Sequence, residues 1–203
     1  NRIGVYAMQV AMTEAIKMNL SVEEADAVFG RPMGIPKTGV FALYDLIGID
    51  LMSDVLKSFK KELSQNDEFQ KVADDIPLIR KLIDTGYTGR KGKGGFYRIN
   101  KINNQKILEA LDLKSNNYSP SKKIDLKINK INLLDLINRN DKYGKYAKSI
   151  ITKVIRYAAF LIPDVTSKYI DVDDALRLGF NWTVGPFEML SNIDTDNFIK
   201  ENL

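Results

Sequence analysis

The sequence contains no histidine and no cysteine among its 203 residues. Without histidine, the chain by itself has neither the commonest general base nor a Ser-His-Asp triad. Without cysteine it has no disulfide framework, no thiol nucleophile and no cysteine-bound zinc, which is typical of a reducing compartment such as the cytoplasm. Any chemistry completed by this chain alone would depend on Asp, Glu, Lys, Tyr or Ser, and we expect no metal site.

Long apolar runs and a strong charge of one sign are also absent. No run reaches the roughly eighteen apolar residues that span a bilayer, so we expect no membrane span. Lysine and arginine total 30, aspartate and glutamate total 26, and acids recur beside the lysines. This near balance predicts a mildly basic solvated surface rather than a nucleic-acid groove. The start at Asn1, with no Met and no signal-peptide n-region, is expected of a cut inside a longer protein.

Most of the chain has helical periodicity, and its 44% of hydrophobic residues can form a packed core. The pattern predicts helices over residues 2–19, 21–29, 40–47, 50–63, 75–86, 142–162, 172–178, 186–190 and 196–202. A short strand is predicted at 95–99. Residues 100–140, rich in Asn, Lys and Ser, are interpreted as a linker with short helices at 105–111 and 133–138. The fold class we predict is all-α.

One order of features occurs twice along the chain. Each time a long amphipathic helix leads to an acidic turn, a Gly loop and a short helix that begins with Phe. The matching segments are 21–25 with 171–175, 30–34 with 179–185, and 41–43 with 187–190. Two divergent copies of one helical unit are the simplest interpretation. We place the first copy at residues 1–98, a linker at 99–141 and the second copy at 142–203.

The Gly-rich stretch 86–95 (GYTGRKGKGG) has the composition of a phosphate-binding loop but not its pattern. A P-loop requires four residues between Gly and Gly-Lys and then Ser or Thr, whereas five residues separate Gly86 from Gly92. A dinucleotide fingerprint follows a strand and opens a helix, whereas this stretch follows a predicted helix. We therefore predict a tight turn in which glycines adopt positive φ while Phe96 and Tyr97 pack against the core.

Pairs of acidic residues could suggest a metal site or acid–base catalysis. Three such pairs occur, at residues 23–24, 74–75 and 173–174. All three lie where helices are predicted to begin, and a carboxylate there stabilises the positive end of the helix dipole. The sequence therefore favours helix capping over catalysis for each pair.

Three longer motifs resemble the C-terminal domain of L-3-hydroxyacyl-CoA dehydrogenases. They are GRPMGIPKTGVFALYDLIGID at 30–50, RKGKGGFY at 90–97 and ALRLGFNWTVGPFEML at 175–190. The resemblance implies a helical domain of the 6-phosphogluconate dehydrogenase C-terminal type, which follows a Rossmann domain that binds NAD. Residues 110–113 (ALDL) and 118–120 (YSP) look most like the multifunctional β-oxidation enzymes. In that type the helical domain is present twice and an enoyl-CoA hydratase domain shares the polypeptide.

The same resemblance implies the reaction and one site residue. The reaction is NAD-dependent oxidation of an (S)-3-hydroxyacyl-CoA to a 3-ketoacyl-CoA, with a catalytic histidine and its glutamate on the Rossmann domain. This chain alone is then expected to be inactive and to hold no NAD. Asn1 of the Asn-Arg motif is expected to hydrogen-bond near the reacting oxygen, although a helix N-cap is the alternative role.

Two expectations concern partners. The two helical copies are expected to pack on each other as an intramolecular pseudo-dimer, because in single-copy members of the family the helical domain pairs two subunits. The alternative to the enzyme is a stand-alone, non-catalytic helical binding module, whose small basic excess would attract nucleic acid. A salt-sensitive shift with RNA of random sequence would favour that alternative.

Overall fold

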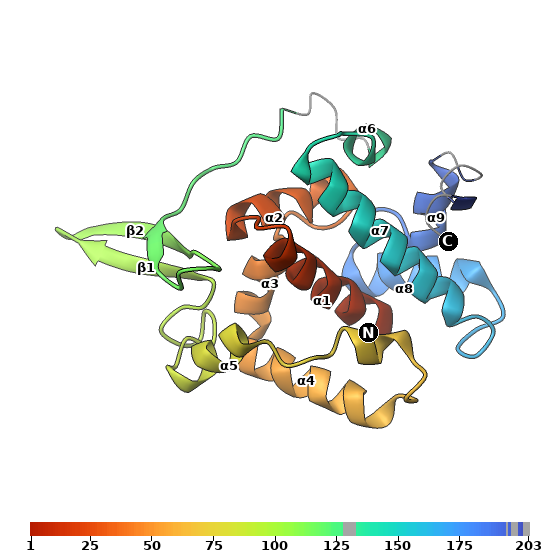
Figure 1. Cartoon of the computed structure of the whole chain (residues 1–203), viewed down its shortest axis with the longest axis horizontal. Coiled ribbons are helices and arrows are strands. Elements are labelled where there is room, and N and C mark those ends of the chain that lie inside the picture. Colours follow the sequence, from red (N-terminus) through yellow and green to blue (C-terminus); the bar gives the residue numbers. More distant parts are fainter. Residues whose placement is uncertain (128–132, 194, 196–198, 201–203) are drawn as a thin grey trace.

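The computed structural model of the protein describes residues 1–127, 133–193, 195 and 199–200 (Figure 1). Its helices are α1 (Arg2–Lys17), α2 (Val22–Val28), η1 (Arg31–Met33), α3 (Val40–Ile47), α4 (Ile49–Glu62), η2 (Glu68–Lys71), α5 (Pro77–Asp84), α6 (Leu133–Ile137), α7 (Lys142–Phe160), α8 (Tyr169–Phe180) and α9 (Pro186–Ser191). They confirm the helices predicted up to residue 190, with the exception of the one at 105–111. The helix predicted at 196–202 falls largely outside the described residues.

Helix α1 is the centre of the fold. Every residue from Ile3 to Met12 is buried, so the helix is covered on all its faces. A helix that is apolar all round requires neighbours on every side. In Figure 1, α7 runs beside α1, and α2, α3 and α8 also pack against it. The rings of Tyr6 on α1 and Tyr157 on α7 stack with 4.0 Å between their centroids.

A three-stranded antiparallel sheet corrects the all-α prediction. Its strands, in the order β1-β2-β3, are β1 (Tyr97–Ile102), β2 (Gln105–Leu111) and β3 (Tyr118–Pro120). The strand predicted at 95–99 is confirmed as the start of β1, whereas the helix predicted at 105–111 is wrong because those residues form β2. The linker assigned to 99–141 therefore carries regular structure.

The turn between β1 and β2 explains the wrong prediction. Asn103 and Asn104 have φ angles of 51° and 63°, the left-handed values that a two-residue type I′ hairpin turn requires. Asn tolerates this conformation better than most residues because its short polar side chain can hydrogen-bond locally. The Asn-Asn pair thus folds the chain back on itself, and the hairpin projects from the helices as an arm (Figure 1).

Helix α3 begins after a glycine and is capped by a side chain from another helix. Gly39 occupies the N-cap position and has no side chain to cap with. Asp26 of α2 instead accepts hydrogen bonds from the backbone N–H groups of Phe41 and Ala42, at 2.6 and 3.1 Å. A Cβ at Gly39 would lie 2.4 Å from the Asp26 side chain. Only glycine therefore lets the carboxylate reach the helix end.

The start of α9 is capped in the same way. Asp173 of α8 accepts hydrogen bonds from the N–H groups of Phe187 and Glu188, at 2.9 and 3.1 Å, behind Gly185 at the N-cap. A Cβ at Gly185 would lie 2.2 Å from an Asp173 oxygen. The sequence correctly predicts that Asp173 caps a helix but names the wrong helix. Asp173 lies within α8 and caps the start of α9.

The Gly-rich stretch forms the predicted tight turn. Gly86, Gly89 and Gly94 have φ angles of 81°, 103° and 124°, and Phe96 is completely buried. The stretch follows helix α5 and leads into strand β1. Of the helices in the described ranges, none is both long and apolar enough to cross a membrane.

Candidate functional site

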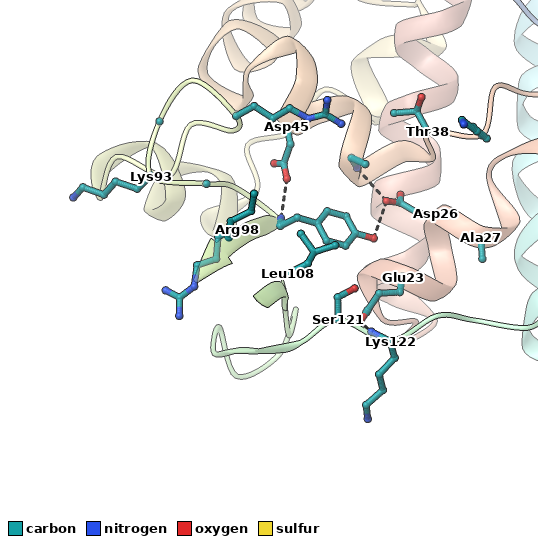
Figure 2. Close-up of a pocket in the computed structure, with 17 residues that line it drawn as sticks. Glu23, Asp26, Ala27, Thr38, Asp45, Lys93, Arg98, Leu108, Ser121 and Lys122 are labelled. Carbon is teal, nitrogen blue, oxygen red and sulfur yellow. Dashed lines mark hydrogen bonds between the residues drawn. The ribbon is translucent and has the colours of Figure 1, made fainter. Parts of the chain in front are cut away.

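A cavity of about 870 Å³ opens between α2, α3, the Gly-rich turn and the β1–β2 hairpin (Figure 2). Cavities of this size commonly hold small molecules. Acidic and basic side chains both line it. The basic ones are Lys37, Arg90, Lys93, Arg98 and Lys122, and Asp26 and Asp45 are among the acidic ones.

The two aspartates have perturbed titration. Burial raises the pKa of Asp26 to about 7 and that of Asp45 to about 6. The Asp45 oxygens accept hydrogen bonds from the backbone N–H groups of Phe96 and Tyr97, at 2.8 and 2.7 Å. The Tyr97 hydroxyl donates to Asp26 at 3.0 Å. Perturbed pKa values often indicate a functional site, but here each carboxylate is bonded to the chain's own backbone and tethers α2, α3 and β1.

The basic side chains around this cavity do not converge on one point. Arg98 forms an ion pair with Glu109 at 2.7 Å, and the Lys93 ammonium donates to the carbonyl oxygen of Thr85 at 3.0 Å. In Figure 2, Lys93, Arg98 and Lys122 point away from the centre of the cavity. Within the described ranges, no three acidic side chains gather as ligands of a metal ion would. The geometry therefore favours a structural role for the charged groups of this cavity.

Asn1, the site residue predicted from sequence, does not line this cavity and lies at the N-terminus of the central helix α1. Its carbonyl oxygen accepts the N–H of Val5 at 2.9 Å, so Asn1 holds the N-cap position of α1. Among the described residues, its side-chain amide makes no capping hydrogen bond, and the residue is exposed. Asn1 thus occupies the N-cap position without the side-chain capping bond that the alternative interpretation requires.

The residue after Asn1 is firmly anchored. The Arg2 Nε donates to the Tyr157 hydroxyl of α7 at 2.7 Å, and the Arg2 guanidinium forms an ion pair with Asp67. Asp67 is buried and also accepts from Tyr157, at 2.9 Å, and from the N–H of Phe69, at 2.8 Å. This Arg2–Asp67–Tyr157 cluster ties the start of α1 to α7 and to the segment between α4 and α5. It therefore determines where Asn1 lies.

Sequence reasoning named Arg2 only as part of a motif and did not find Asp67 or Tyr157. Asp67 stands in a polar stretch directly before the short helix η2, and Tyr157 is one Tyr within an amphipathic helix. Neither pattern indicates a contact across 155 residues of chain, which is the separation of Arg2 and Tyr157. Only the packing of α7 on α1 brings these groups together.

Comparisons with known proteins give a family model for the first half of the chain and several longer relatives. Residues 1–99 match the model of the "3-hydroxyacyl-CoA dehydrogenase, C-terminal domain" family. A protein of Rickettsia prowazekii, named as a fatty acid oxidation complex trifunctional enzyme, is 37% identical over 94% of this chain and 26% of its own length. A Rickettsia felis protein with the same name is 38% identical over the same shares. A Bacillus subtilis protein, named as a 3-hydroxyacyl-CoA dehydrogenase, is 28% identical over 93% of this chain and 24% of its own length.

The chain spans about a quarter of the length of these relatives. No solved structure matches it. The match to the family model ends at residue 99, whereas the similarity to the Rickettsia proteins continues through most of the remaining chain. The order of segments seen here is therefore also present in longer proteins.

Proposed function

We propose that the chain is the substrate-side helical part of a 3-hydroxyacyl-CoA dehydrogenase, because residues 1–99 match the C-terminal domain of that family. In the whole protein the reaction would be NAD-dependent oxidation of an (S)-3-hydroxyacyl-CoA to the 3-ketoacyl-CoA in fatty-acid β-oxidation. The catalytic histidine and glutamate would belong to another part of the protein, since this chain contains no histidine.

The observation that carries the proposal is the state of Asn1. Its amide is exposed and makes no capping bond within the described residues, while Arg2 holds the backbone beside it against α7. A neutral amide can donate a hydrogen bond to an oxygen on which charge develops, without adding a competing base. We assign Asn1 that role toward the reacting oxygen of the substrate.

The residues of this chain do not fit NAD. The Gly-rich stretch 86–95 follows helix α5 and leads into strand β1, which is the reverse of the strand-to-helix order of a dinucleotide fingerprint. The Gly-rich stretch is therefore not proposed as the site of NAD. A Rossmann domain elsewhere in the whole protein would bind it.

Residues 142–203 are proposed to be a second copy of the helical unit of residues 1–98. The matching caps support this: Asp26 caps α3 behind Gly39, and Asp173 caps α9 behind Gly185. A carboxylate, a glycine and two N–H groups recur in the same arrangement. The match of segments 21–25 and 171–175 pairs Asp173 with Glu23. The capping contacts instead pair Asp173 with Asp26, which lies one helical turn after Glu23.

The two copies are proposed to form an intramolecular pseudo-dimer through α1 and α7. The Tyr146 hydroxyl of α7 donates to the Ala11 carbonyl oxygen of α1 at 2.8 Å. Ser149 and Lys153 of α7 both bond to Glu14 of α1, at 2.6 and 2.8 Å. Burial alone would raise the pKa of Glu14, but the hydrogen bonds from Lys153 and Ser149 outweigh it and hold that pKa below its ordinary value. The first long helix of each proposed copy therefore packs on the other.

Three further parts of the proposal concern the whole protein. In the proposed organisation, residues 99–141 connect the two helical copies, and most of the β1–β2 hairpin belongs to this connection. The whole protein would carry an enoyl-CoA hydratase domain on the same polypeptide, by similarity to relatives named as trifunctional enzymes. It would be cytoplasmic, as the absence of cysteine favours.

The experiment joins this chain to its Rossmann domain and follows NADH formation from 3-hydroxybutyryl-CoA. Turnover by the wild-type protein and loss of turnover on Asn1→Ala support the proposal. Calorimetric titration of the 203-residue chain with NADH is the second measurement, and binding at micromolar concentration would contradict the assignment of NAD to another domain. The alternative function is a stand-alone helical binding module. It is supported if turnover is absent and the chain binds random-sequence RNA in a salt-sensitive gel-shift assay.

A further inference from the structure

A second cavity, of about 350 Å³, lies between α1, α3 and the end of α8. We name it the α1–α3 groove. Its principal side chains are Met8, Leu43, Ile47, Phe180 and Trp182. The described residues that line it are all uncharged, in contrast to the charged cavity of Figure 2. Leu43, Ile47 and Phe180 are only half-buried, so the groove presents apolar surface that the chain itself does not cover.

The groove is lined by residues on the same helix as the proposed substrate residue, Asn1. Asn1, Gly4 and Met8 are spaced by three and four residues, which puts them on one face of α1. Gly4 and Met8 line the groove. With a rise of about 1.5 Å per residue, Gly4 lies about 4.5 Å and Met8 about 10 Å beyond Asn1 along the helix axis. A ligand that meets Asn1 with a polar group can thus continue into the groove with an apolar one.

Contacts from the end of α8 give the groove a fixed wall. The Phe180 ring packs directly on Gly4, where a Cβ would lie 2.3 Å from the ring. Beyond Trp182, both the N–H and the hydroxyl of Thr183 donate to the carbonyl oxygen of Gly34, at 2.8 and 3.1 Å. The wall is therefore held on both sides of Trp182, and glycine at position 4 is what admits the aromatic ring.

We propose that the α1–α3 groove binds the acyl chain of the 3-hydroxyacyl thioester and that Phe180 and Trp182 set the chain length it accepts. This inference rests on the proposed function, since it uses Asn1 as the residue that meets the oxygen-bearing carbon. The ligand class follows from the lining, because uncharged half-buried side chains gain from contact with methylene groups and offer nothing to a phosphate. Each methylene that enters should raise affinity about fourfold, which corresponds to about 0.8 kcal/mol.

Trp182 is the only tryptophan of the sequence, so its fluorescence reports the groove directly. The 203-residue chain is titrated with four thioesters of increasing chain length: 3-hydroxybutyryl-CoA, 3-hydroxyhexanoyl-CoA, 3-hydroxyoctanoyl-CoA and 3-hydroxydecanoyl-CoA. We expect the Trp182 emission to change on binding. The ligand concentration that gives half of this change should fall about fourfold for each added methylene until the groove is filled. An emission that does not change, or changes alike for all four ligands, overturns the proposal.

A variant on α8 tests the position of the acyl chain. Gly179 lines the groove, and a Cβ added there meets no atom within 4 Å, so Gly179→Leu adds an apolar side chain at the groove without a clash at that atom. Ala175→Leu adds a similar side chain to an exposed position of the same helix that does not line the groove. We expect Gly179→Leu to abolish the gain from the longer chains and Ala175→Leu to keep it. Equal binding of the long chains by both variants overturns the proposal.

Failure of this inference is distinguishable from failure of the proposed function. Turnover of 3-hydroxybutyryl-CoA by the whole enzyme tests the function and needs little of the groove. If that substrate is oxidised but the chain-length dependence is absent in both Trp182 fluorescence and kcat/KM, the groove assignment fails and the function stands. If no substrate is oxidised while Trp182 still responds to chain length, the function fails and the groove remains an acyl-binding site.

Discussion

Removing the Arg2 guanidinium should destabilise the whole fold, because Arg2 is the cation that neutralises a buried carboxylate. In Arg2→Met, Asp67 keeps its hydrogen bonds from Phe69 and Tyr157 but loses its ion pair. The Asp67 side chain is only 2% exposed, whereas that of Arg2 is 27% exposed. Breaking a buried ion pair by removing one partner costs about 3–5 kcal/mol. The partial exposure of Arg2 puts the expected loss at the lower end, about 3 kcal/mol.

The assay is urea unfolding followed by circular dichroism. Arg80→Met is the matched control, since Arg80 pairs with Asp75 on the surface, where the side chains are 68% and 54% exposed. An exposed pair of this kind contributes at most about 1 kcal/mol. Arg2→Met should therefore lower the free energy of unfolding by clearly more than Arg80→Met does.

A double-mutant cycle tests the cause of the loss. Asp67→Asn removes the buried charge, so Arg2→Met should cost less in that background than in the wild type. A pairwise coupling close to zero, or equal losses for Arg2→Met and Arg80→Met, would refute the argument that a buried charge is left unpaired. The start of α1 would then owe its position to the apolar packing of α1 on α7.

The other predictions concern the substrate residue, pH and the proposed copies. In the intact enzyme, Asn1→Ala should lower kcat by roughly ten- to a thousandfold, the range for one transition-state donor, and unchanged steady-state kinetics would reduce Asn1 to an N-cap. Burial raises the pKa of Asp26 to about 7, so the folded state binds this proton more tightly than the unfolded state. The contribution of Asp26 to stability should therefore fall as the pH rises from about 4 to about 7, and urea midpoints of Asp26→Asn should lack that part of the pH dependence. Residues 1–98 alone should dimerise or aggregate whereas the full chain is largely monomeric, and a well-behaved monomer of 1–98 by light scattering would mean that the copies do not need each other.

The sequence predicted the helices well because their signals are local. Ser21 and Glu24 form the expected capping box at the start of α2, with hydrogen bonds of 3.2 and 3.0 Å. The sheet was not predicted, because the Asn103-Asn104 turn was interpreted as part of a polar linker. The strand β2 (Gln105–Leu111) is also stabilised by its pairing with β1, for which a one-dimensional pattern carries no direct signal.

Of the candidate site, the sequence predicted only Asn1, through the Asn-Arg motif at residues 1–2. Asn1 could be named from the sequence, but the state of its side chain could not, since the residue holds the N-cap position and makes no side-chain capping bond among the described residues. The α1–α3 groove was not predicted at all. Gly4 has no feature in the sequence that links it to Phe180, and the contact between them exists because α8 returns to α1 late in the chain.

The position of Tyr157 changes how the proposed second copy should be understood. The sequence predicts only that this copy packs on the first. Yet its helix α7 supplies the hydroxyl that bonds to Arg2, and its helix α8 supplies the Phe180 ring that lies on Gly4. Both contacts are made within one turn of Asn1. If Asn1 meets the substrate as proposed, then residues 142–203 position the substrate residue and wall the groove beside it, and the chain could not lose them and keep a defined site.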